Sequence, residues 1–172
     1  NDVRGSRVLS GYLREALGLL RGYSEGWIDS EDIFNMTLYG QWLAVLNLWN
    51  AGHGLAPHNL RFYYNPINRL FEPVAFDNQA RTDTGKDDFH GAGFVQLSSS
   101  QQFISSYTET LNKLRDQLNN GVLGNRIKRW EAEFLQALIE EEGVEPFPVK
   151  FLHERAAFLN EALPARTNNA RM

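Results

Sequence analysis

The stretch HGLAPHNLRFYYNPINRLFEPVAFDNQ, residues 53–79, decides how the middle of this chain folds. Two β-prone runs, Leu60–Tyr64 and Leu70–Phe76, flank the sequence NPINR. Asn-Pro favours a turn, and the aromatic residues favour strands, so the stretch predicts an antiparallel hairpin. A hairpin returns the chain to its own start. Polar groups at its two ends are therefore expected to lie close together.

The two ends of this hairpin carry an amide and a carboxylate. Asn59 precedes the first run, and Asp77 directly follows the second. Both are hard oxygen ligands of the kind that Mg²⁺ prefers. The pattern therefore predicts a cation site, and it leaves two plainer interpretations open. Asp77 could cap the following turn, and Asn59 could satisfy backbone groups at the strand start.

Helical patterns surround the hairpin. Apolar spacing predicts a helix over 6–21, with Gly22 as its stop, and a second from Asp29 or Ser30 to about Trp49. Apolar residues nearly encircle the second helix, which predicts a central, buried position. Three further helices are expected. The first begins at a capping box formed by Ser98 and Gln101. The second is indicated by a stripe of apolar residues after residue 125, and the third by a final apolar run that ends before Pro164. The stripe and the final run consist of Ile127, Trp130, Phe134 and Leu138, and of Phe151, Leu152, Phe158, Leu159 and Ala162.

The whole chain is expected to form one lobe, mainly α with a small β-hairpin. Its 172 residues suit a single domain over 1–172 with a polar tail at 164–172. The net charge of −4 and the lack of a basic stripe argue against a nucleic-acid partner. The apolar runs are too short to span a bilayer. With no Cys, disulfides and thiol chemistry are excluded.

Familiar catalytic motifs are missing. The chain has no phosphate-binding glycine loop, no H-E-x-x-H and no G-x-S-x-G. The order of elements around residues 53–79 fits another arrangement instead. In protein kinases a buried helix leads to a loop with a base Asp and a metal-binding Asn, and a hairpin then leads to a second metal-binding Asp. A long polar segment follows Asp77, over 78–93, where kinases keep an activation segment.

A family resemblance rests on the same residues. DIFNMTLYGQWLAVLNLWNAGHGLAPHNLRFYYNPINRLFEPVAFD, residues 32–77, resembles the CotH-type kinase family, named for spore coat protein H. The similarity continues through FVQLSSSQQFISSYTETLNKLRDQL, residues 94–118. It implies the carboxyl-terminal lobe of an atypical protein-kinase-like fold. ATP would be the phosphoryl donor, Mg²⁺ or Mn²⁺ the metal, and protein Ser or Thr residues the acceptors, in a protein substrate that the sequence does not identify.

The resemblance assigns roles residue by residue. Asn59 and Asp77 match the two metal-binding positions, which also hold the nucleotide phosphates through the metal. The base Asp has no counterpart, because NAGHGLAPH, residues 50–58, contains no carboxylate. His53 is the nearest candidate, and a neutral imidazole can accept a proton near pH 7. The plainer interpretation of His53 is a polar residue after a helix end.

The chain also departs from the family in length. The nucleotide-clamping lobe would lie before residue 1, so we expect an excised fragment that binds ATP poorly. Surface that such a lobe would cover is expected to favour self-association. Two other functions stay open. One is a pseudokinase-like interaction module without catalysis, and the other is a metal-dependent hydrolase built on His53, His58 and Asp77. The cellular location is not indicated.

Overall fold

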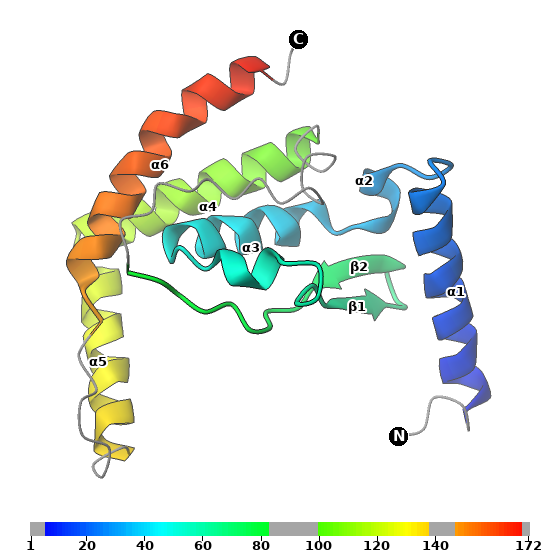
Figure 1. The fold of residues 1–172 in the computed structure, drawn as a ribbon, viewed down its shortest axis with the longest axis horizontal. Coiled ribbons are helices and arrows are strands. Elements are labelled where there is room, and N and C mark those ends of the chain that lie inside the picture. Colours follow the sequence, from blue (N-terminus) through cyan, green and yellow to red (C-terminus); the bar gives the residue numbers. More distant parts are fainter. Residues whose placement is uncertain (1–5, 83–99, 138–146, 170–172) are drawn as a thin grey trace.

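The computed structural model describes residues 6–82, 100–137 and 147–169. This part of the chain is mainly helical and includes one two-stranded antiparallel sheet (Figure 1). The predicted class, mainly α with a small β-hairpin, is therefore confirmed. The elements are α1 (Arg7–Ser24), α2 (Ser30–Ile33), α3 (Met36–Leu48), the 3-10 helix η2 (Gly52–Leu55), β1 (Phe62–Asn65), β2 (Leu70–Pro73), α4 (Gln101–Asn119), α5 (Val122–Ala137) and α6 (Val149–Asn169).

Helix α3 lies at the centre of the molecule and packs along α4 (Figure 1). Two polar bonds, one near each end of α3, join it to α4. Ser106 donates to the main-chain oxygen of Thr37 at 2.8 Å, and Asn47 Nδ2 donates to the Tyr107 hydroxyl at 3.0 Å. The buried position predicted for this helix is confirmed, since most of its side chains lie in the core: Met36, Tyr39, Leu43, Ala44, Leu46 and Leu48.

The ends of the first helices differ from the sequence predictions. Gly22 does not stop α1 but lies buried within it, because the Ile28 side chain occupies the space that a Cβ would need. The helix predicted from residue 29 or 30 to 49 is divided into α2 and α3. Asn35 separates them and caps α3 by accepting from Leu38 N at 3.1 Å.

The hairpin forms where the sequence predicted it, with strands shorter than expected. Phe62 pairs with Pro73, and Asn65 pairs with Leu70. The hairpin is attached to the start of α3 through its second strand: Asn35 N donates to the Phe71 main-chain oxygen at 2.9 Å. The two ends of the hairpin are thereby held beside the central helix.

The carboxyl-terminal helices form a second core against the end of α3. Buried members are Leu48, Leu118, Leu123, Ile127, Phe151, Leu152 and Ala156. Ser100, rather than Ser98, caps α4, its Oγ accepting from Phe103 N; Ser98 lies outside the described residues. Helix α6 continues past Pro164 to Asn169 instead of ending before it.

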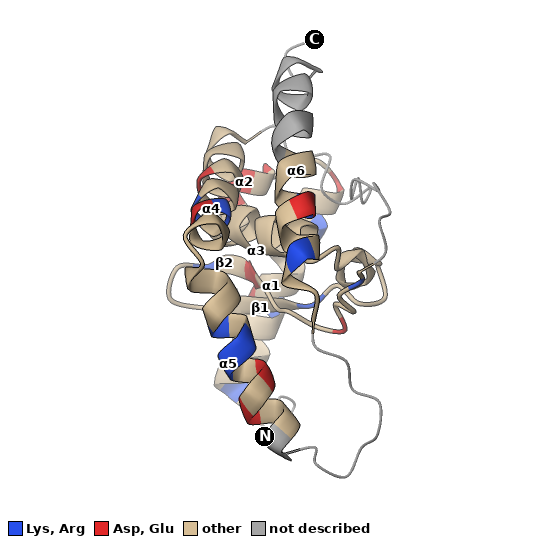
Figure 2. Ribbon diagram, turned by 90° about the vertical axis from the view of Figure 1, so that its left-hand side faces the viewer, with Lys and Arg blue, Asp and Glu red and all other residues tan. Residues whose placement is uncertain are grey.

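Helix α5 projects beyond this second core and carries basic and acidic residues together (Figure 2). Its predicted stripe is buried at Ile127, whereas Trp130 and Phe134 are exposed. Leu138 lies outside the described residues. Among the helices that the structure describes, none combines the length and apolar character that crossing a bilayer requires.

Candidate functional site

The loop after α3 carries the first two candidate residues. The chain leaves the helix through Asn50, which adopts a left-handed conformation (φ 48°), and then forms the short η2 turn. Asn59 is buried and its Nδ2 donates to the main-chain oxygen of His53 at 3.0 Å. The side-chain amide of Asn59, just before the first strand, therefore holds the loop that carries His53 in place.

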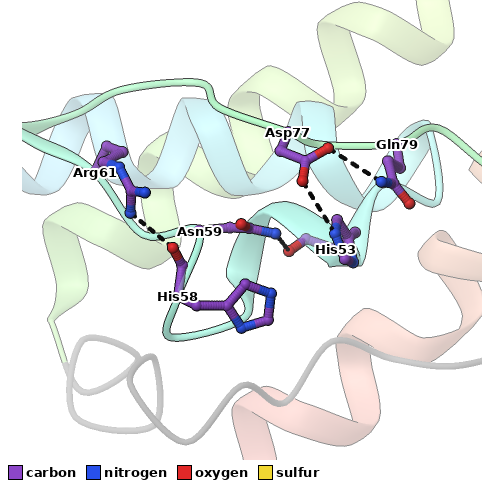
Figure 3. A network of polar contacts seen from close by, with 6 residues as sticks. All are labelled: His53, His58, Asn59, Arg61, Asp77 and Gln79. Atoms are coloured by element: carbon purple, nitrogen blue, oxygen red, sulfur yellow. Dashed lines mark hydrogen bonds and ion pairs between the residues drawn. The ribbon is translucent and has the colours of Figure 1, made fainter.

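Asp77 approaches this loop from the far end of the hairpin. Its Oδ2 lies 3.2 Å from His53 Nε2, and its Oδ1 accepts from Gln79 Nε2 at 3.1 Å. Figure 3 shows the carboxylate pointing from its own segment toward the loop. Asp77 and Gln79 both have left-handed φ values, 45° and 44°. Left-handed conformations cost free energy in residues other than glycine. Here they form the turn that places the Asp77 carboxylate beside the His53 loop.

The structure brings His53, Asn59 and Asp77 into one cluster. His53 is the link, since Asn59 bonds its main chain and Asp77 bonds its ring. The pair is accessible, with 37% of the His53 side chain and 41% of the Asp77 side chain exposed. A carboxylate can only accept, so a neutral His53 would carry its hydrogen on Nε2. Nδ1 is then left as the proton-accepting nitrogen.

The donor atoms fit a magnesium ion in their chemistry. Asn59 uses its nitrogen on His53, and its Oδ1 makes no hydrogen bond among the described residues. Both Asp77 oxygens have partners, but a carboxylate offers about four acceptor positions in all. Mg²⁺ is commonly held by one or two carboxylates together with water and substrate phosphates. Asn59 and Asp77 could therefore hold the ion in that manner.

The alternative transition-metal site is not formed. Within the described ranges, no three His, Cys, Asp or Glu side chains lie where they could share a metal ion. The His58 ring faces the His53 ring edge-on, with centroids 5.8 Å apart, and its backbone oxygen binds Arg61. His53, His58 and Asp77 therefore do not form, in the described part of the chain, the three-ligand group on which the hydrolase hypothesis was built.

Arg61 lies beside the loop that carries His58 and Asn59 (Figure 3). Its Nη1 donates to the main-chain oxygens of His58 and Leu60, at 2.8 and 2.9 Å. Its guanidinium also stacks 4.6 Å from the centre of the Phe76 ring. Arg61 therefore connects the start of the first strand with the residue before Asp77, and so it tightens the base of the hairpin.

Three residues of the cluster were missed by sequence reasoning. Gln79 holds one oxygen of Asp77. Gly54 follows His53 and lies against the side chain of Asn78, which follows Asp77. The signals were present as the dipeptide His-Gly and the run Asp-Asn-Gln. Gly, Asn and Asp are frequent in any turn, however, so these letters did not mark the contact.

Comparisons of this chain with protein-family models, with curated proteins and with solved structures gave no match.

Proposed function

We propose that this chain is the carboxyl-terminal lobe of a CotH-type kinase-like protein. Its activity would be magnesium-dependent transfer of a phosphoryl group from ATP to Ser or Thr residues of a protein. The observation that supports the proposal most is the return of Asp77 to the loop of His53 and Asn59. The kinase arrangement requires this convergence, because both metal ligands must reach one cation.

In this proposal each residue has a definite task. Asn59 and Asp77 hold Mg²⁺, which when bound neutralises charge on the phosphates of ATP. His53 accepts the proton of the attacking hydroxyl at Nδ1, because its Nε2 faces Asp77. A bond forms between that hydroxyl oxygen and the γ-phosphorus. The bond from this phosphorus to the β–γ bridging oxygen breaks, and ADP leaves.

The test is a phosphorylation assay on the natural protein that contains this sequence. It is incubated with labelled ATP and Mg²⁺ or Mn²⁺, and incorporation into Ser or Thr is measured. Asp77→Ala should reduce incorporation to background. His53→Ala should lower the rate by about 10²–10⁴-fold, the usual contribution of a general base.

Matched controls exist for both substitutions. Asp116 is an exposed carboxylate on α4, and His153 is an exposed histidine on α6. Asp116→Ala and His153→Ala should leave incorporation unchanged. Equal incorporation in the parent protein and in folded Asp77→Ala would refute the assignment of the metal site.

A second function, a non-catalytic kinase-like module, is favoured by two observations. Both carboxylate oxygens of Asp77 are engaged by side chains of the protein, His53 and Gln79. A site that has lost its chemistry would keep such internal bonds as structure. In addition, residues 50–58 contain no carboxylate.

The two functions differ in what ATP does. The module would bind ATP without turnover or would not bind it, and Asp77→Ala would then leave its remaining interactions intact. Calorimetric titration with ATP and Mg²⁺, done beside the phosphorylation assay, separates the two outcomes. Binding with no incorporation under any tested metal would favour the module.

A further inference from the structure

Two turns meet at the candidate site with almost no space between them. A Cβ built on Gly54 would lie 2.1 Å from Asn78 Oδ1 and 3.1 Å from its Cγ. The Asn78 Oδ1 atom is itself buried and has no hydrogen-bond partner among the described residues. The Asn78 side chain therefore fills the volume that any other residue at position 54 would claim.

The backbone at Gly54 does not require glycine for conformational reasons. Its φ lies outside the left-handed region, which among the described glycines is adopted by Gly26 and Gly121. The reason for glycine is therefore the close approach of Asn78. Steric contact of this kind is local and specific, since Gly54 follows His53 directly and Asn78 follows Asp77 directly.

The geometry points to Gly54 as a positioning residue for the His53–Asp77 pair. Because Gly54 has no side chain, the turn at 77–79 can pack against the turn at 52–55. The Asn78 side chain makes this contact with Gly54. This packing of the 77–79 turn places the Asp77 carboxylate beside the His53 ring. The inference deepens the proposed function, because it names what sets the position of the proposed metal ligand.

A substitution series can separate this role from general stability. Gly54→Ala adds one methyl group where Asn78 lies, and the 77–79 turn should be displaced. Asn78→Ala removes the obstructing atoms and leaves the bonds of His53 and Gln79 to Asp77. In the double variant, Gly54→Ala with Asn78→Ala, the new Cβ meets the Asn78 backbone Cα at 3.3 Å, which small adjustments can relieve.

The readout is a nuclear Overhauser contact between the His53 ring protons and the Asp77 β-protons. We expect it in the natural chain and in Asn78→Ala. It should disappear in Gly54→Ala and return in the double variant. Gly18→Ala is the matched control, because nothing lies within 4 Å of a Cβ added there, and it should keep the contact.

Thermal unfolding followed by circular dichroism is recorded for each variant. If Gly54→Ala is too unstable to study, the double variant should regain both its melting temperature and the contact. The inference is overturned if Gly54→Ala keeps the full contact, or if the folded double variant fails to regain it. Neither result depends on metal, ATP or catalysis. A restored contact without phosphorylation would therefore count against the proposed function alone.

Discussion

A buried tyrosine of the core, Tyr39, is expected to make the free energy of unfolding depend on pH. Tyr39 is 2% exposed, and its burial raises the pKa of its phenol, with a smaller contribution from the neighbouring Tyr23. In the unfolded chain a tyrosine loses its proton near pH 10. The buried phenol keeps its proton there. Above that pH the unfolded state binds fewer protons than the folded state, so stability must fall as pH rises.

We therefore predict an alkaline limb in the stability profile. The stabilisation is fully present below about pH 10 and is lost above it, by about 1.4 kcal/mol per pH unit. Urea unfolding at a series of pH values measures the slope. Tyr39→Phe should flatten the limb, whereas Tyr63→Phe, at an exposed position, should not. An unchanged limb in Tyr39→Phe would assign the alkaline loss to other groups.

A second residue-scale prediction concerns the start of α3. Asn35 Oδ1 accepts from Leu38 N, whereas Asp29, at the equivalent position before α2, makes no such bond with its side chain. Asn35→Ala should cost about 1 kcal/mol of unfolding free energy, the usual value of a helix cap. Asp29→Ala should cost less. Chemical denaturation compares the two, and a larger loss in Asp29→Ala would contradict the capping assignment.

At the scale of elements, the carboxyl end of α3 connects three helices. The Asn47 side chain binds Tyr107 on α4, and its main-chain oxygen accepts from Arg155 Nε on α6 at 2.9 Å. Arg155 is 4% exposed and also stacks on Phe158. A cation at a helix carboxyl end is favourable, because the last carbonyls carry partial negative charge. Helix α6 thereby supports the end of the helix that leads into the His53 loop.

Arg155→Gln should lower the unfolding free energy by about 1–3 kcal/mol, because a buried charged bond is lost. Lys150→Gln on the same helix is the control. Lys150 is 87% exposed and pairs with Glu154 one turn away, so its loss should cost at most about 0.5 kcal/mol. Equal effects in urea unfolding would contradict a special role for Arg155.

The elements were predictable from sequence where periodicity was strong. The apolar pattern from residue 29 or 30 to about 49 predicted a buried helix, which α3 forms over Met36–Leu48, and the two runs around NPINR predicted the hairpin. The break at Asn35 was not predictable, because it depends on pairing with Phe71, a tertiary contact. Similarly, Gly22 lies within α1, and the Ile28 side chain packs against it. The helix propensities of the residues near Asn35 and Gly22 do not predict either contact, with Phe71 or with Ile28.

The site was predictable in outline at the same scale. A hairpin must return its end to its start, so the approach of Asp77 to the loop followed from residue order. The contacts of Asp77 with His53 and of Asn78 with Gly54 did not follow. They depend on how two turns fit together, and Asp77 adopts a left-handed conformation beside that contact. Segment 83–93 of the predicted polar loop lies outside the described residues.

At the scale of the whole molecule, the helices form a support for one small polar cluster. The first core holds the hairpin against α3, and the second core holds the carboxyl end of the same helix. The His53 loop follows α3, and the chain that leaves the hairpin brings Asp77 to within 3.2 Å of the His53 ring. We propose that this convergence makes a site for a divalent cation.

Paramagnetic broadening by Mn²⁺ in ¹H–¹⁵N spectra of this chain tests that claim most directly. We predict selective loss of the amide signals of His53, Asn59 and Asp77 on titration. Asp77→Ala should abolish the effect, and Asp116→Ala should preserve it. Broadening that spares these three residues, or that persists unchanged in folded Asp77→Ala, would contradict the account.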